Sequence, residues 1–268
     1  MHKTLFIVAA GLSTRFNGKP KHLAKIKGVP SIEHTLRMAS AWYNSIYVVL
    51  NEKATEETIE DTRAIASMYG ARQILIPSGK GDADAVFQSL DKSGNDDSCV
   101  SVCWGDAWFK NASVFKMASQ ALEEKDYSSI VFDAMCAMEE SPYGWFSIDS
   151  DGTILKAEFA SDYGVESLAD GAYAAHDQCF FNINVQNFKE EFDQYSEFAE
   201  AEVASLEHII EKYTSVVKLS LKHEMSWYKM INWANKMKSS LKSTVTVLAE
   251  PVALSFNTEE DLEKIRDA

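Results

Sequence analysis

A loop rich in phosphate-binding groups follows the first apolar run of the sequence. The segment AAGLSTRFNGKPK, residues 9–21, turns at a glycine and then presents hydroxyl and cationic side chains: Gly11, Ser13, Thr14, Arg15, Lys19 and Lys21. Glycine lets the backbone turn with its N–H groups exposed, while the hydroxyl and cationic groups add donors and charge. This combination predicts a polyphosphate site, with a solvent-exposed basic loop as the alternative. The spacing matches neither GxxxxGKS/T nor GxGxxG, which argues against those nucleotide-binding families.

Charge is distributed unevenly along the chain. There are 26 basic and 40 acidic residues, and the formal net charge of −14 would repel the phosphate backbone of a nucleic acid. We therefore expect no nucleic-acid binding. Residues 1–32, however, carry six cations and no acid, so this segment is suited to face an anion.

Three later segments place small or acidic residues where predicted strands end or helices begin. Gly79–Ala85 (GKGDADA) follows one apolar run, Trp104–Asp106 (WGD) closes another, and Ser255–Leu262 (SFNTEEDL) leads into the last predicted helix. Open α/β sheets bind ligands at the carboxyl ends of their strands, and a carboxylate there suits Mg²⁺ shared with phosphates. Each segment alone also has a structural explanation: a loop before a helix, an aspartate turn or a helix cap.

Together these segments resemble the signature elements of nucleotidyltransferases with a GT-A-like Rossmann fold. That family includes sugar-phosphate nucleotidylyltransferases, methylerythritol-phosphate and phosphocholine cytidylyltransferases, and molybdenum-cofactor nucleotidyltransferases. Its first motif usually reads AAGxGxRMxxxxPK, and here Pro20 and Lys21 supply the closing pair. Ser13 replaces the second glycine, Phe16 replaces the methionine, and Asp82 replaces the threonine of a GTAxA-type turn. The resemblance spans nearly the whole chain.

The resemblance implies roles for many of these residues. Arg15 and Lys21 would be catalytic, stabilising the triphosphate and the departing pyrophosphate. Asp106 would hold Mg²⁺, and Asn257 would be either a second metal ligand or only a helix cap. The nucleotide would contact three parts of the chain: the glycine loop, the GTAxA-type turn at 78–83 (the second turn) and the aspartate of WGD. The residues are Ala9, Ala10, Gly11, Leu12, Ser13, Thr14, Arg15, Lys21, Ser78, Gly79, Gly81, Ala83 and Asp106.

The middle of the chain resembles the substrate-binding part of the family less closely. AHDQCFFNINV, residues 175–185, is similar to the strand that lines the substrate pocket, which makes Asn182 and Asn184 candidate substrate contacts. The lysine of the family's Glu-Lys pair is missing after Glu158, so we expect Lys156 to replace it. Solvated or turn-forming side chains are the alternatives at these positions.

The elements that must position these residues alternate in type. Apolar β-branched runs alternate with helical-period segments through the first half, which predicts βαβ units and a parallel sheet. Strands are expected at 4–10, 45–50, 73–77, 98–104, 128–135, 175–185, 215–221 and 244–250, and helices at 31–42, 54–70, from 83, 111–124, 188–213 and after a cap at Asn257 or Thr258. A hairpin is expected around SDG at 150–152.

The predicted fold class is α/β: a mostly parallel Rossmann-like sheet with helices on both faces and a smaller mixed α+β substrate-binding insertion. We expect a single domain over residues 1–268, with the substrate-binding or lid portion at about 140–250. Four cysteines lack zinc spacing, and Cys99 and Cys103 should be buried thiols. No export signal and no apolar run of ~20 residues is evident, which predicts a soluble cytoplasmic protein without membrane contact.

These observations predict a Mg²⁺-dependent nucleotidyltransferase. It would join a nucleoside triphosphate, CTP or UTP by preference, to a small phosphorylated substrate and release pyrophosphate. The substrate would be a sugar phosphate or a phosphocholine-like metabolite. A glycosyltransferase of related architecture and a non-catalytic nucleotide-binding protein are the alternatives. The sequence leaves the oligomeric state open, with a homodimer as one option.

Overall fold

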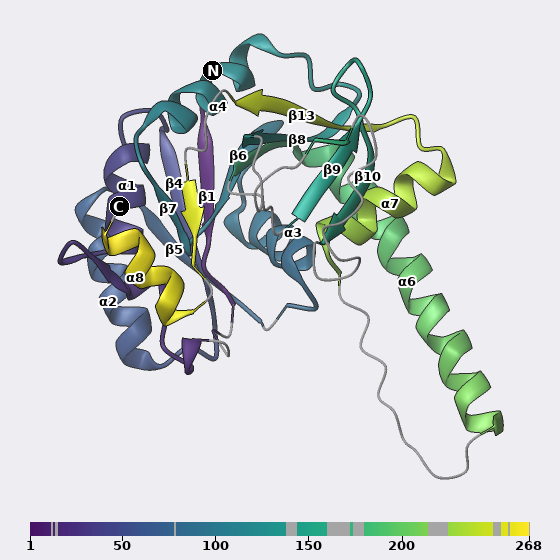
Figure 1. The fold of residues 1–268 in the computed structure, drawn as a ribbon, viewed down its shortest axis with the longest axis horizontal. Helices are drawn as coiled ribbons and strands as arrows, with labels where there is room; N and C mark the ends of the chain where they lie inside the picture. Colours follow the sequence, from purple (N-terminus) through teal and green to yellow (C-terminus); the bar gives the residue numbers. More distant parts are fainter. Residues whose placement is uncertain are drawn as a thin grey trace.

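The computed structural model describes residues 1–11, 13, 16–77, 79–137, 144–159, 172–173, 180–213, 225–248, 253–256 and 258–267. Its largest element is a seven-stranded sheet in the order β13-β8-β12-β6-β1-β4-β5 (Figure 1). The strands are β1 (Thr4–Val8), β4 (Ser45–Asn51), β5 (Arg72–Ile76), β6 (Cys99–Trp104), β8 (Ile130–Ala137), β12 (Phe180–Asn184) and β13 (Lys242–Leu248). β12 runs antiparallel to both neighbours, and the other neighbouring pairs are parallel. The predicted mostly parallel sheet is confirmed.

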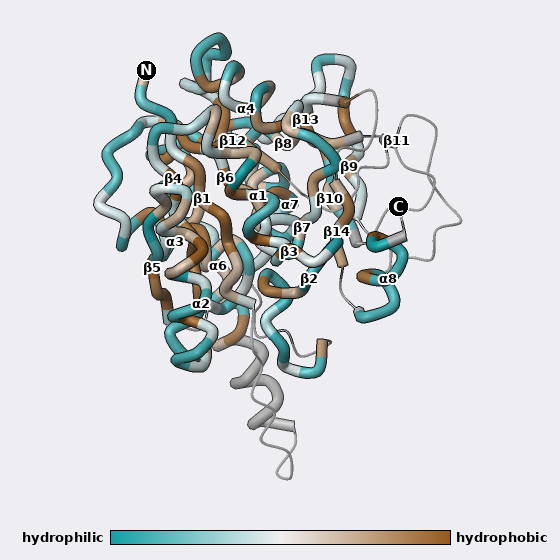
Figure 2. Tube along the Cα trace, turned by 90° about the vertical axis from the view of Figure 1, so that its left-hand side faces the viewer, coloured by the Kyte–Doolittle hydropathy of each residue, from teal (hydrophilic) through white to brown (hydrophobic). Residues whose placement is uncertain are grey.

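Both faces of this sheet are buried, as near-continuous apolar strands require. Leu5 and Ile7 of β1 belong to one hydrophobic cluster and Phe6 to another, because successive side chains of a strand point to opposite faces. The first cluster takes its helical residues from α1 (Ser31–Ala39), α2 (Glu56–Met68) and α4 (Ser113–Glu124), and the second from α3 (Asp82–Ser93), α6 (Val185–Tyr213) and α7 (Trp227–Met237). Figure 2 shows the hydrophobic residues, in brown, gathered on the strands inside the molecule. Helices therefore cover both faces, as predicted.

A smaller three-stranded sheet lies beside the large one. It consists of β9 (Gly144–Ile148), β10 (Ile154–Phe159) and β11 (Ala172–Tyr173), in the order β10-β9-β11. The predicted hairpin is confirmed: β9 and β10 pair antiparallel, and the Asp149 carboxylate accepts hydrogen bonds from the N–H groups of Asp151 and Thr153. β12 and β13 fall within the stretch at about 140–250 yet belong to the large sheet. The strand expected at 215–221 lies outside the described residues.

The carboxyl-terminal segment returns to the amino-terminal part of the chain. β14 (Ala253–Ser255) pairs with β7 (Ala107–Phe109), and α8 (Glu259–Asp267) packs on the hairpin of β2 (Lys25–Ile26) and β3 (Val29–Pro30). Thr258 and Asp261 cap α8 reciprocally, since each side chain accepts from the backbone N–H of the other. The predicted cap is thus confirmed at Thr258.

Two further expectations are tested by burial and helix composition. Cys99 and Cys103 are buried free thiols, as expected. Among the described residues, none of the helices combines the length and the apolar composition that crossing a bilayer demands.

Candidate active site

The loops that follow β1 and β6 meet at the carboxyl edge of the large sheet. The two strands are parallel neighbours, and Val8 pairs with Trp104 at their ends. The Gly105 N–H donates to Val8 O at 2.9 Å. A Cβ on Gly105 would lie 2.5 Å from the Cβ of Ala9, so only glycine permits this approach. The sequence therefore brings the start of the first motif against the WGD motif.

Lys21 and Asp106 form an ion pair across this junction. Lys21 belongs to the short helix η2 (Lys21–Leu23), and its Nζ lies 2.9 Å from Asp106 Oδ2. The lysine side chain is 12% exposed and the aspartate 32%, so both reach solvent from a partly buried position. Arg15 lies outside the described residues, as do Leu12, Thr14, Ser78 and Asn257.

Apolar and buried groups fix the loop that carries Lys21. Phe16 is 2% exposed and packs on Phe256, with the ring centroids 5.9 Å apart. His22 is also buried, and its Nε2 lies 2.9 Å from Thr62 Oγ1. Burial lowers the pKa of His22 to about 4, so the imidazole is neutral at physiological pH. The packing of Phe16 and the contact of His22 with Thr62 hold η2 against α8 and α2, while Lys21 points to Asp106.

The start of the glycine loop is held by backbone contacts. Ala9 N–H donates to Val49 O at 2.8 Å, and the amide of Asn51 donates to Ala10 O at 3.4 Å. Ser13 has φ 49°, the left-handed region, which explains why the family usually has glycine there. Asn51, at the end of β4, was not among the expected site residues. Its polar side chain at the carboxyl end of a buried strand is the signal that identifies it.

The second turn leads directly into α3 and contacts a distant segment. Ala83 is fully buried, and its N–H donates to Met225 O at 3.1 Å. A Cβ on Gly81 would overlap the Met225 backbone. Glycine is therefore needed at this position because the turn packs directly on Met225. Asp82 Oδ1 accepts hydrogen bonds from Ala83 N at 2.7 Å and Trp227 N at 3.0 Å. Gly79 precedes these residues and approaches the Asp84 carboxylate.

The residues around Asp106 fit a metal that arrives with a nucleotide. Among the described residues, no group of three or more His, Cys, Asp or Glu side chains is arranged to hold a metal ion. Mg²⁺ is often bound by one or two carboxylates and completes its shell with waters and substrate phosphates. One partly exposed carboxylate is therefore a sufficient protein contribution. Phe256 N–H donates to Asp106 O at 3.4 Å, which brings the end of β14 to this aspartate.

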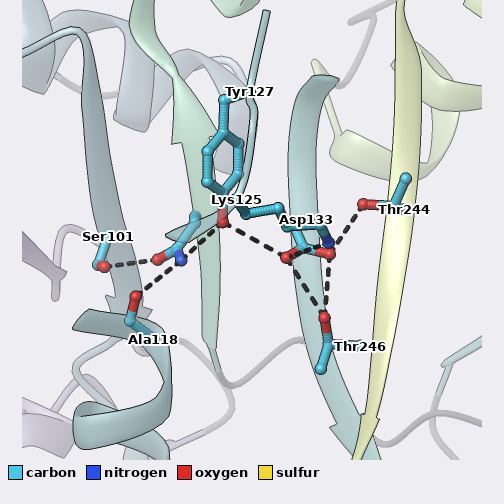
Figure 3. A network of polar contacts seen from close by, with 8 residues as sticks. Ser101, Ala118, Lys125, Tyr127, Asp133, Thr244 and Thr246 are labelled. Atoms are coloured by element: carbon cyan, nitrogen blue, oxygen red, sulfur yellow. Dashed lines mark hydrogen bonds and ion pairs between the residues drawn. The ribbon is translucent and has the colours of Figure 1, made fainter. Parts of the chain in front are cut away.

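Asn182 is a core residue, which corrects the predicted substrate contact. It is 0% exposed, its Oδ1 accepts from Ser101 Oγ at 2.5 Å, and its Nδ2 donates to Ala118 O and Tyr127 Oη (Figure 3). The network continues to Asp133, which is also fully buried and contacts the side chains of Lys125, Tyr127, Thr244 and Thr246. Burial raises the pKa of Tyr127, and the negative charge of Asp133 raises it further. These bonds join β6, β12, β8 and β13.

Asn184 lies at the wrong edge of the sheet for the predicted substrate contact. Because β12 is antiparallel to β6, Asn184 pairs with Cys99 at the start of β6, whereas Phe180 pairs with Cys103 near Asp106. Its Oδ1 accepts from Asn187 N at 2.9 Å, which caps the start of α6. Its role in this structure is therefore that of a helix cap.

Lys156 and Glu158 pair on β10, on the same face of the small sheet. Lys156 Nζ lies 2.5 Å from Glu158 Oε1, and the side chains are 55% and 6% exposed. The ion pair places the two candidate substrate contacts next to each other. The pair belongs to the smaller sheet, whereas Lys21 and Asp106 lie at the edge of the large sheet.

Comparison with known proteins identifies a family and a shared fold. The family described as the MobA-like NTP transferase domain matches residues 5–146, more than half of the chain. A search of curated proteins finds no significant match.

Solved structures match over nearly their whole length. CMP:2-keto-3-deoxy-manno-octonic acid synthetase complexed with CTP aligns with a TM-score of 0.66 and 13% identity, covering 100% of this chain and 98% of the other. The nucleoside-diphosphate-sugar pyrophosphorylase from Vibrio cholerae RC9 gives 0.66 and 12%, covering 99% and 100%. HddC from Yersinia pseudotuberculosis, complexed with GMP-PN, gives 0.64 and 13%, covering 99% and 98%. At such low identity these matches show a shared fold.

Proposed function

This chain belongs to the MobA-like NTP transferase domain family, and from that premise we propose that it transfers a nucleotidyl group from a nucleoside triphosphate to a small phosphorylated substrate, releasing pyrophosphate. The observation that carries the proposal is the contact of Lys21 Nζ with Asp106 Oδ2 at 2.9 Å. It unites a cation from the first motif with the carboxylate of the WGD motif at the edge where parallel sheets bind ligands.

The chemistry asks for positioning and charge neutralisation. A phosphate oxygen of the substrate attacks the α-phosphorus of the triphosphate, a new P–O bond forms, and the bond to the pyrophosphate oxygen breaks in line. The attacking oxygen is already an anion, so no general base is required. Two anions must instead be held together, and this is the task that fixed cations perform.

Lys21 is suited to stabilise the triphosphate and the departing pyrophosphate, together with Arg15. Its side chain is only 12% exposed and its backbone is fixed by the anchors at Phe16 and His22, so its charge is positioned before the nucleotide arrives. Asp106 would hold Mg²⁺, with Asn257 as a second ligand. When bound, the metal supplies charge neutralisation between the phosphates. The proposed phosphate-binding loop has four residues that the structure describes before Phe16: Ala9, Ala10, Gly11 and Ser13.

The nucleotide base and the acceptor are the finer part of the proposal. We favour CTP or UTP with a sugar phosphate or a phosphocholine-like acceptor. One structure of this fold was solved in complex with CTP and another in complex with GMP-PN. The Lys156–Glu158 pair is the proposed acceptor contact on β10.

A substrate panel tests the function directly. The protein is incubated with Mg²⁺, each of the four nucleoside triphosphates and a set of sugar phosphates and phosphocholine, and pyrophosphate release is recorded. A nucleotidyltransferase releases pyrophosphate only when both a triphosphate and its acceptor are present. A glycosyltransferase would release nucleoside diphosphate from a nucleotide sugar, and a nucleotide sensor would bind without turnover. Either of those results would overturn the proposal.

A further inference from the structure

The second turn is joined by backbone hydrogen bonds to the segment that begins α7. Met225 N–H donates to Lys80 O at 2.8 Å, and Ala83 N–H donates to Met225 O at 3.1 Å. Gly81 lies against the same Met225 backbone, where a larger residue would collide. The turn that would approach the nucleotide therefore also pairs with a segment more than 140 residues later in the chain.

Asp82 links the amino-terminal ends of two helices. It is the first residue of α3, and its Oδ1 accepts from Ala83 N at 2.7 Å and from Trp227 N, the first residue of α7, at 3.0 Å. Both donors belong to helix amino termini, which carry partial positive charge and are stabilised by a carboxylate. Hydrogen bonds to a charged acceptor are stronger than those between neutral groups. A threonine, frequent in the family at this position, brings no such charge.

From α7 the connection continues to the strand that carries the proposed acceptor contacts. The Asn232 side chain makes two bonds to the backbone of Ala157: it accepts from Ala157 N at 2.8 Å and donates to Ala157 O at 2.6 Å. Asn235 donates to the carbonyls of Ile154 and Leu155 at 3.0 and 2.9 Å. These amides bind the backbone of β10, the outer strand in the order β10-β9-β11, on which Lys156 and Glu158 lie.

We propose that Asp82 is a positioning residue that couples the nucleotide turn to the acceptor strand through α7. Nucleotide binding that orders residues 79–83 thereby orders the start of α7, and Asn232 and Asn235 transmit this order to β10. The benefit for the reaction is that the acceptor oxygen is aligned with the α-phosphorus only when the nucleotide is in place. The proposal rests on the nucleotidyltransferase function proposed above.

Three variants separate this role from general stability. Asp82→Ala removes the shared acceptor, whereas Asp82→Asn keeps an oxygen that can accept from Trp227 N. Thr55→Ala is the matched control, because Thr55 caps α2 through Thr58 N at 3.2 Å and its loss removes a helix cap without touching α7. Hydrogen exchange of the α7 amides is measured with and without Mg²⁺–CTP, Mg²⁺–UTP, Mg²⁺–ATP and Mg²⁺–GTP. Calorimetry gives the Kd for each nucleotide.

The expected result has two parts. Without nucleotide, Asp82→Ala should speed exchange at the start of α7 by about tenfold or more, and Thr55→Ala should not. With the bound nucleotide, the wild type, Asp82→Asn and Thr55→Ala should show slowed exchange in α7, while Asp82→Ala binds the nucleotide within about threefold of the wild-type Kd and shows no such slowing.

Three results would overturn the proposal in distinguishable ways. Equal nucleotide-dependent protection of α7 in Asp82→Ala and the wild type removes the coupling role and leaves the proposed function intact. A loss of nucleotide affinity of about tenfold or more in Asp82→Ala would put Asp82 in the nucleotide site itself. If the wild type binds none of the four nucleotides, the proposed function fails and the coupling fails with it.

Discussion

Replacing His22 should remove a specific acid instability from this protein. His22 is 5% exposed, and burial lowers its pKa from 6.5 to about 4. The unfolded chain therefore takes up a proton as pH falls through 6.5, whereas the folded protein takes it up only near pH 4. Stability is complete above pH 6.5 and is lost progressively between these two values. At roughly 1.4 kcal/mol per pH unit the interval amounts to about 3 kcal/mol, of which about 2 kcal/mol is lost between pH 7 and pH 5.

Urea denaturation of the wild type and His22→Gln at pH 7 and pH 5 measures this contribution. Glutamine can still donate to Thr62 Oγ1 but does not titrate, and any loss of packing affects both pH values alike. The unfolding free energy of the wild type should fall by about 2 kcal/mol more than that of His22→Gln. Equal losses in the wild type and His22→Gln would refute the reasoning.

Further substitutions probe the residues that support the site. Gly105→Ala should destabilise the protein by about 1–3 kcal/mol and weaken nucleotide binding because its Cβ meets Ala9, and adding Ala9→Gly should restore both in urea denaturation and calorimetry. Phe16→Ala should cost about 3 kcal/mol or more of unfolding free energy, whereas Phe16→Met should cost less than about 1.5 kcal/mol; a Phe16→Ala protein as stable as the wild type would contradict the packing on Phe256. Asp133→Ala should cost about 3 kcal/mol because it leaves buried partners unpaired, and a loss below about 0.5 kcal/mol in thermal unfolding would contradict the network in Figure 3.

The parts of the fold that follow from local patterns were predictable. Alternating β-branched runs and helical periods identify the parallel strands, and the rule that ligands bind at their carboxyl ends brings the loop of Lys21 to Asp106. This contact can be predicted without the rest of the chain, because β1 and β6 are adjacent and parallel.

Strand direction and burial explain why Asn184 and Asn182 do not lie where the sequence predicted. The run at 180–184 has an apolar pattern that fits a strand of either direction. Only the observed antiparallel pairing places Phe180 at the ligand edge and Asn184 at the other. Asn182 points into the sheet's buried face, where its partners Ser101 and Tyr127 come from distant parts of the chain. No local signal distinguishes such a satisfied core asparagine from a pocket residue.

The role of Asp82 depends on a contact that sequence spacing does not encode. Its partner Trp227 begins a helix that the sequence analysis did not identify, and the two residues are 145 positions apart. As an isolated residue Asp82 fits the usual preference for acids in the first turn of a helix. The structure adds the second helix that shares its carboxylate.

The most direct test of the central claim compares pyrophosphate release by the wild type, Lys21→Met and Lys19→Met at saturating Mg²⁺ and substrates. Lys19 is the matched control, because it lies in the same loop but pairs with Glu259 at 3.3 Å and is 68% exposed. We predict that Lys21→Met loses about a hundredfold or more in rate, equivalent to roughly 3 kcal/mol of transition-state stabilisation, while Lys19→Met stays within about threefold of the wild type. A folded Lys21→Met protein that releases pyrophosphate at the wild-type rate would contradict the proposed site.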